Sequence, residues 1–188
     1  MPPIKKFQRE EIIDTAYEIV KREGFDSINA RRIAKELGGS VQPIYHNFAT
    51  MEELKKEVSD RIYKKYQTTM REATDTEHSY LEKGIAYVRF AKEYPEFYKI
   101  IFMQESKMNL DEFIQADIEV TENVMESITQ KFDISKEDLK DFHIKVWIFT
   151  HGLACLVATK TVNFTDDEIR KLLLNTVQEI FRGYKKGD

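Results

Sequence analysis

The segment ELGGSVQPIYHNF, residues 36–48, places two adjacent glycines, a proline and two aromatic residues close together in an otherwise polar stretch. It is too polar for a buried helix and too short to fold alone. We therefore expect these residues to lie at the surface, between helices that hold them in place.

The residues before this segment have the pattern of two short helices. One is predicted over residues 8–23, because apolar residues recur there at helical spacing and Gly24 is a residue type that ends helices. The second is predicted over residues 30–37, with Asn29 as its N-cap.

A third, very short helix is predicted after Gly38-Gly39. Ser40 would be its N-cap, which puts Pro43 in the first turn, where a missing N–H costs no hydrogen bond. Residues 50–53 have the pattern of a capping box that opens a long helix to about residue 73. Two helices joined by a tight glycine turn, the second short and polar, are typical of a helix-turn-helix.

The outer side of this third helix carries residue types that read DNA. Glutamine and asparagine can bind adenine through two hydrogen bonds, valine and proline can touch thymine methyl groups, and tyrosine and histidine can bind phosphate. The predicted reading residues are Ser40, Val41, Gln42, Pro43, Tyr45, His46 and Asn47. The alternative is a helical corner that binds nothing.

Charge is unevenly distributed along the chain. The net charge of −4 is the wrong sign for a phosphate-binding protein, but residues 1–65 carry +2 and residues 66–188 carry −6. Only the N-terminal third therefore suits DNA, although a solvated mixture of charges explains the charge pattern equally well. Candidates for a basic face are Lys5, Lys6, Arg9, Arg31, Arg32, Lys35, Lys55 and Lys56.

The composition indicates a helical globular protein, with 41% hydrophobic and 33% charged residues, 7 Gly and 4 Pro in 188 residues. Cys155 is the single cysteine, and the first 25 residues contain no apolar core of signal-peptide length, so we expect a cytoplasmic protein without a membrane span. The predicted fold is all-α, with about nine helices. Those after residue 73 are expected over residues 77–94, 95–103, 110–132, 136–161 and 166–182.

Residues 12–58 resemble the N-terminal domain of the TetR family of bacterial transcriptional regulators. The matching residues are Ala16, Gly24-Phe25, Ile33-Ala34, Gly38, Ile44-Tyr45, Phe48 and Glu53-Leu54. Residues 93–102 and 147–156 resemble segments of the family's C-terminal domains. The resemblance implies a DNA-binding domain at residues 1–50, an effector-binding and dimerisation domain at residues 51–188, and DNA contacts by Ala30 and Arg31.

The sequence departs from the family pattern at two positions. Gly39 stands where the family usually has a small apolar residue that pins the turn, so either the turn is looser or Val41 supplies that packing. Met51 takes the place of a common phosphate-binding lysine, for which Lys55 and Lys56 can compensate. If they do not, the alternative is a helical ligand-binding dimer with a degenerate DNA-reading end.

The last two predicted helices carry more apolar residues than one packed face requires. In the family these helices pair with their copies in a second subunit, although burial within one chain explains the excess equally well. A two-fold dimer places two recognition helices about 34–36 Å apart, where they read two half-sites of a palindrome. The predicted interface residues are Leu153, Leu156, Val157, Leu173, Val177 and Ile180.

Aromatic residues and methionines gather on the middle helices, which enclose an effector in the family. Such residues commonly fill a core, but together they fit a cavity for an apolar or aromatic small molecule. The predicted effector-binding residues are Tyr87, Phe90, Tyr94, Tyr98, Phe102, Met103, Phe113, Trp147 and His151.

Other kinds of site find little support in the sequence. His151 and Cys155 share a helix face, but no third ligand is evident nearby, so no metal or cofactor is predicted. The sequence has no nucleophile elbow, Walker loop, zinc-protease motif or dinucleotide fingerprint. We therefore expect a DNA-binding regulator, more often a repressor than an activator in the family, and not an enzyme.

Overall fold

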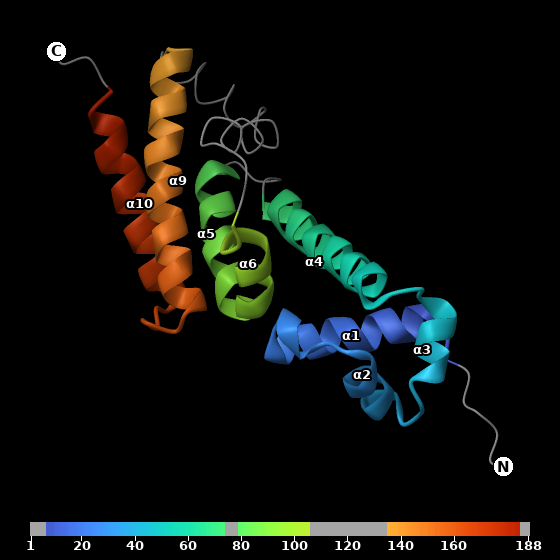
Figure 1. Cartoon of the computed structure of the whole chain (residues 1–188). Coiled ribbons are helices and arrows are strands. Elements are labelled where there is room, and N and C mark those ends of the chain that lie inside the picture. Colours follow the sequence, from blue (N-terminus) through green and yellow to red (C-terminus); the bar gives the residue numbers. More distant parts are fainter. Residues whose placement is uncertain (1–6, 74–78, 106–134, 185–188) are drawn as a thin grey trace. The chain divides into compact units, whose positions relative to one another are not determined.

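The computed structural model describes residues 7–73, 79–105 and 135–184. Within these ranges the chain forms α-helices, one 3-10 helix and no strand, which confirms the predicted all-α fold (Figure 1). The elements are α1 (Arg9–Glu23), η1 (Phe25–Ser27), α2 (Ala30–Leu37), α3 (Gln42–Asn47), α4 (Met51–Ala73), α5 (Ser79–Glu93), α6 (Pro95–Phe102), α9 (Lys136–Ala158) and α10 (Asp166–Arg182). The helix predicted over residues 110–132 lies outside the described residues. None of the described helices is long and apolar enough to cross a bilayer.

Local capping chemistry determines where several of these helices begin. The Asn29 side chain accepts a hydrogen bond from the backbone N–H of Arg32 at 3.0 Å, and Ser135 caps α9 in the same way. At the start of α10, the Thr165 backbone N–H donates to the Glu168 carboxylate at 2.8 Å, which completes a capping box. The predicted starts of α2, α9 and α10 are therefore confirmed.

The start of α3 differs from the prediction. Its N-cap is Val41, in a helical backbone conformation and with no capping hydrogen bond, so the assignment of Ser40 as N-cap is wrong. A side-chain cap would serve the N–H groups of the second and third helical residues, but Pro43 has no N–H and the Ile44 N–H donates to the Val41 carbonyl at 3.1 Å, so neither needs one. Pro43 does lie in the first turn, as predicted, and Thr50 Oγ1 accepts from the Glu53 N–H at 3.1 Å as α4 begins.

The helices group into two compact units. The first contains the described residues of Met1–Thr68 and Tyr94–Gln104, and the second contains those of Thr69–Glu93 and Glu105–Asp188. The boundary expected at residue 50 falls inside the first unit, because this unit includes α4 from its start at Met51 as far as Thr68. Helix α6 belongs to the first unit although it follows α5 in the sequence.

The core of the first unit forms around α1, which packs against α2, α3 and α6. On α6, the Phe97 ring centroid lies 4.8 Å from that of Tyr17. The Glu96 carboxylate lies 2.8 Å from the position that a Cβ would take on Gly24, so the end of α1 and the start of α6 are in close contact. The buried face of α1 consists of Ile12, Ile13, Ala16, Ile19 and Val20.

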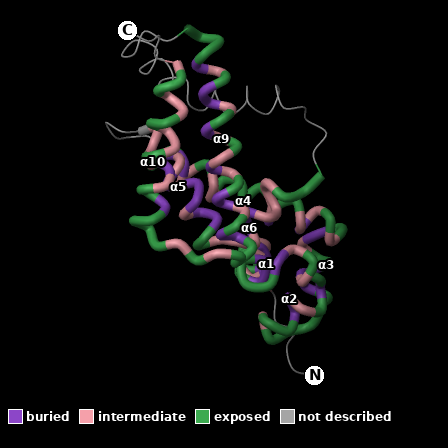
Figure 2. Tube along the Cα trace, turned by 90° about the vertical axis from the view of Figure 1, so that its left-hand side faces the viewer, coloured by how far each residue is buried: buried purple, intermediate pink, exposed green. Residues whose placement is uncertain are grey.

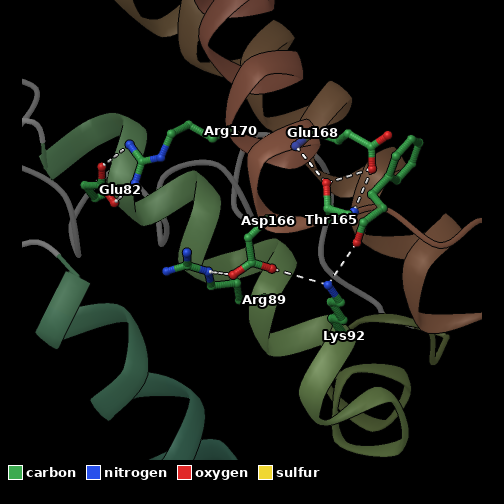
Figure 3. A network of polar contacts seen from close by, with 8 residues as sticks. Glu82, Arg89, Lys92, Thr165, Asp166, Glu168 and Arg170 are labelled. Atoms are coloured by element: carbon green, nitrogen blue, oxygen red, sulfur yellow. Dashed lines mark hydrogen bonds and ion pairs between the residues drawn. The ribbon is translucent and has the colours of Figure 1, made fainter.

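In the second unit, α5 packs against both α9 and α10. Buried positions recur at helical spacing along α9 (Figure 2). Charged side chains bridge α5 and α10 at their surface: Arg170 donates two hydrogen bonds to Glu82, at 2.7 and 3.1 Å (Figure 3). Asp166 accepts from Lys92 at 3.3 Å and from Arg89 at 2.8 Å, and these contacts, led by that of Lys92, lower the pKa of its carboxyl. Exposed ion pairs of this kind add little stability, so their main effect is to fix the register of the two helices.

Candidate functional site

The turn between α2 and α3 is closed by its own backbone. Gly38 adopts a left-handed conformation, with φ 67° and ψ 39°, and its N–H donates to the Lys35 carbonyl at 3.2 Å. The N–H of Gly39 donates to the Ala34 carbonyl at 2.9 Å. These two bonds form a Schellman motif, which ends α2 and turns the chain toward α3.

One side of α3 is buried and the other reaches solvent. Ile44 is fully buried against the core, whereas the Tyr45 residue is 53% exposed and Val41 is 37% exposed. Because Val41 is exposed, it does not supply the packing that Gly39 lacks, which was one of the two alternatives considered for this turn. The exposed predicted reading residues are Ser40, Val41, Gln42, Tyr45 and His46.

Three of the residues predicted to contact DNA are buried or half-buried. Pro43 is buried, as is Ala30, which is 6% exposed at the start of α2. Asn47 is half-buried, and its Nδ2 donates to the carbonyls of Pro43 at 2.8 Å and Phe7 at 3.1 Å. Both amide hydrogens of Asn47 are thus used inside the protein, so it does not offer them to a base.

The candidate basic face is smaller than the sequence suggested. Arg32 is paired with Glu36 at 3.0 Å and with Glu23, and Arg9 is paired within the protein as well. Lys5 and Lys6 lie outside the described residues, and the half-buried Lys55 lies over the Phe25 ring, 5.8 Å from its centroid. Among the candidates for the basic face, those that are exposed and have no ion pair with another described residue are Arg31, Lys35 and Lys56.

Arg9 connects α1 to the end of α3 and to α4. Its guanidinium donates to the Asn47 carbonyl at 2.5 Å and to the carboxylates of Glu53 and Glu57 at 2.9 and 3.0 Å. It also lies 4.1 Å from the ring centroid of Phe48. The hydrogen bond from Arg9, followed by that from the Ala49 N–H, lowers the pKa of the Glu53 carboxyl. Arg9 therefore connects α1, the end of α3 and α4 through its own hydrogen bonds.

The second unit contains a small cavity between α5 and α9. Its volume is about 50 Å³. The Tyr80 hydroxyl lies 3.1 Å from His143 Nδ1, and the Lys83 side chain is buried with it. The lining residues are Tyr80, Lys83, Gly84, Tyr87, His143, Val146, Trp147 and Thr150.

His151 lies beside this cavity and connects two of its lining residues. Its Nδ1 is 2.9 Å from the Tyr87 hydroxyl, and its ring stacks on Trp147 with centroids 4.8 Å apart. Burial lowers the pKa of the His151 imidazole, which favours the neutral form. Its Nε2 lies 3.5 Å from the Cys155 sulfur, and no third metal ligand joins this pair within the part of the chain that the structure describes.

The predicted effector-binding residues do not form one group. Tyr87 and Trp147 line the cavity and His151 adjoins it, whereas Phe90 is fully buried on α5 outside the lining. Phe113 lies outside the described residues. The remaining four belong to the first unit: Tyr94, Tyr98, Phe102 and Met103. There, Tyr98 is a core residue and Phe102 contacts Tyr66. The prediction therefore grouped together aromatic residues that belong to two separate clusters, one in each unit.

Several lining residues were not predicted. On α5, Tyr80 and Lys83 were missed and share a helical spacing with the predicted Tyr87; on α9, His143 was missed and lies one turn before the predicted Trp147. This common spacing on two facing helices is the signal that would have identified the cavity.

Most predicted dimer-interface residues are already covered within the protomer. Leu153, Val157 and Leu173 are at most 7% exposed, because α5 packs against α9 and α10, so they offer little surface to a second copy of the chain. Val177 and Ile180 are partly buried against a cluster of Leu139, Phe142 and Val146. Leu156 is 43% exposed. The sequence missed two further exposed apolar residues, Ile148 at 54% and Leu174 at 39%.

Comparison with known families agrees with this arrangement. Residues 12–58 match the model of bacterial regulatory proteins of the tetR family, and residues 81–179, more than half of the chain, match the tetracyclin repressor-like C-terminal domain. The chain belongs to the TetR family. As a TetR-family transcriptional regulator it carries a DNA-binding N-terminal domain, and the predicted family resemblance is confirmed.

Solved structures share the TetR fold at low sequence identity. A TetR-like transcriptional regulator from Rhodococcus sp. RHA1 is 16% identical, with a TM-score of 0.64 over 96% of this chain and 100% of that chain. A tetR-family bacterial regulatory protein from Rhodococcus RHA1 is 18% identical, with a TM-score of 0.61 over 96% and 98%. A protein with unknown function from Rhodococcus sp. RHA1 is 17% identical, with a TM-score of 0.73 over 99% and 100%. A comparison with curated proteins gave no match.

Proposed function

We propose that this TetR-family regulator is a cytoplasmic, homodimeric repressor that binds a palindromic double-stranded DNA operator and releases it when a small molecule binds. The exposed side of α3 carries the proposal. Gln42 and Val41 suit base edges and thymine methyl groups, and Tyr45 and His46 suit phosphates. The buried Ile44 on the opposite side holds this surface to the core.

An apolar strip on α9 supports the homodimer. Ile148, Gly152 and Leu156 are exposed at spacings of one helical turn, and a Cβ on Gly152 would meet nothing within 4 Å. Leu174 on α10 is also exposed. A second copy of the chain that covers these residues would remove apolar surface from water and present two α3 helices to two half-sites.

The cavity between α5 and α9 supports a small-molecule effector. Aromatic walls with a few polar groups are typical of ligand sites, but about 50 Å³ is well below the roughly 300 Å³ at which such sites usually begin. An apolar or aromatic effector therefore has to separate the lining side chains. Because the half-buried Trp147 and His151 stack on each other, they would move together.

The order of the helices provides a covalent route from this cavity to the DNA-reading unit. Helix α5 lines the cavity, and after the single residue Tyr94 the chain enters α6, which packs against α1. The Tyr94 ring stacks on Phe97. The Nζ atoms of Lys21 and Lys65 lie over the same ring, 5.6 and 5.5 Å from its centroid. An effector that shifts α5 would also shift Tyr94, whose ring is held by these contacts. The effector would then favour one state of the dimer and the operator another.

The first experiment selects bound duplexes from a random DNA pool with the purified protein and then titrates the selected duplex at several salt concentrations. We expect a palindrome whose half-sites lie about one helical turn apart, with an affinity that falls steeply as salt rises. The selected operator then allows screening for small molecules that release it. If no duplex is enriched, even at low salt, the protein is either a helical ligand-binding dimer with a degenerate DNA-reading end or a regulator that needs its ligand to bind DNA.

A further inference from the structure

The Phe7 side chain occupies the space beside Gly39. A Cβ built on Gly39 would lie 2.5 Å from Cε2 and 2.7 Å from Cζ of the Phe7 ring, and the three atoms nearest to it all belong to Phe7. Gly39 is not one of the glycines with positive φ in the described residues, which are Gly24 and Gly38. The backbone therefore admits an alanine at position 39, but the Phe7 ring would have to move to make room for its Cβ.

Phe7 also contacts the other end of α3. Its carbonyl accepts a hydrogen bond from Asn47 Nδ2 at 3.1 Å. Gly39 precedes α3 and Asn47 is its last residue, so Phe7 contacts the chain on both sides of the recognition helix. Arg9, two residues further along, donates to the Asn47 carbonyl.

A helix as short as α3 needs such support. Six residues form less than two turns, and isolated helices shorter than about 12–15 residues are marginal in water. Reading a base edge also requires the helix to be held at a defined position, because hydrogen bonds weaken steeply when their geometry is poor.

We infer that Phe7 is a positioning residue for the recognition helix, and that Gly39 is a glycine in this protein because the Phe7 ring lies against it. The inference rests on the proposed DNA binding. It predicts that residues 7 and 39 are coupled: a larger residue at position 39 displaces the Phe7 ring and shifts α3, and it does no further harm once the ring has been removed.

A double-mutant cycle tests the inference with Phe7→Ala, Gly39→Ala and the double variant, together with Phe7→Leu as the conservative replacement. The measured quantity is the ratio of affinities for the selected operator and for random duplex DNA, with the thermal unfolding midpoint recorded for each variant. We expect Gly39→Ala and Phe7→Ala each to lower this ratio at least fivefold, the double variant to be no worse than Phe7→Ala, and Phe7→Leu to recover part of the loss. Additive losses, or an unchanged ratio in the single variants, would overturn the inference.

Amide hydrogen exchange in the DNA-free protein separates this inference from the proposed function. We expect Phe7→Ala to increase exchange at the N–H groups of Tyr45 and Phe48, which bond within and after α3, and to leave the centre of α1 unchanged. If the wild-type protein enriches no duplex, the proposed function fails, whereas unchanged exchange at α3 shows that Phe7 does not position the helix.

Discussion

Arg9 and Glu53, 44 residues apart in the sequence, are joined by a hydrogen bond of 2.9 Å between the start of α1 and the first turn of α4. The same guanidinium donates to the last residue of α3. Arg9 therefore links three helices of the DNA-reading unit: α1, α3 and α4. We therefore expect the orientation of α3 to depend on this ion pair within the protein.

Replacement of Arg9 by Gln is expected to lower stability near neutral pH and to have less effect in acid. Glu53 has a lowered pKa in the folded protein, so its contribution is present above the ordinary pKa of a glutamate and is lost as the pH falls through the lowered value. The measurement is chemical denaturation of both proteins between pH 7 and pH 3. Arg31→Gln is the control, since that arginine is exposed. If the free energies of unfolding of wild type and Arg9→Gln differed by the same amount at all pH values, the expectation would be contradicted.

Tyr45→Ala is expected to weaken operator binding without loss of stability or of the dimer, because Tyr45 is 53% exposed. A hydrogen bond to a charged phosphate contributes about 1.5–3 kcal/mol, so Kd should rise roughly 10- to 150-fold. Tyr45→Phe separates the hydroxyl from the ring. The matched control is Tyr63→Ala, which removes a 50% exposed tyrosine from α4. Wild-type operator affinity in Tyr45→Ala would remove Tyr45 from the site.

Ile148→Glu is expected to convert the protein to monomers. Burial of an isoleucine contributes about 1.5–3 kcal/mol to the free energy of association. A two-fold interface contains each substitution twice, so the dissociation constant of the dimer should rise at least roughly a hundredfold. Sedimentation over a range of concentrations measures this. Met103→Glu, which places the same charge at a 47% exposed position of the first unit, should leave the dimer intact. A dimer of unchanged strength in Ile148→Glu would place the interface elsewhere.

His151→Gln is expected to flatten the pH dependence of stability in mild acid. Burial lowers the folded pKa of His151, so the unfolded chain binds the proton first, and stability falls as the pH drops below about 6.5 toward the folded value. Thermal unfolding midpoints between pH 8 and pH 5 report this change. His46→Gln, at an exposed position on α3, serves as the matched control. A wild-type pH profile in His151→Gln would show that His151 does not contribute.

The parts of the fold that depend on contacts between residues close together in the sequence could be predicted from it. Asn29 and Thr165 were identified as caps because each finds its backbone partner three residues away. The roles of Pro43 and Asn47 could not be predicted, since their burial depends on Phe7 and on the packing of α3 against α1. Likewise, the apolar pattern of α9 does not show which of its faces α5 covers.

The ion pairs of Arg9 and Arg32 have a consequence for the whole population of the regulator in a cell. Non-specific binding to DNA depends on the number of cations that displace counterions, and the pairing of Arg9 and Arg32 takes two cations out of the candidate basic face. We expect each molecule to spend little time on unrelated chromosomal sequence. A small copy number would then suffice to keep one operator occupied, because little protein is sequestered elsewhere.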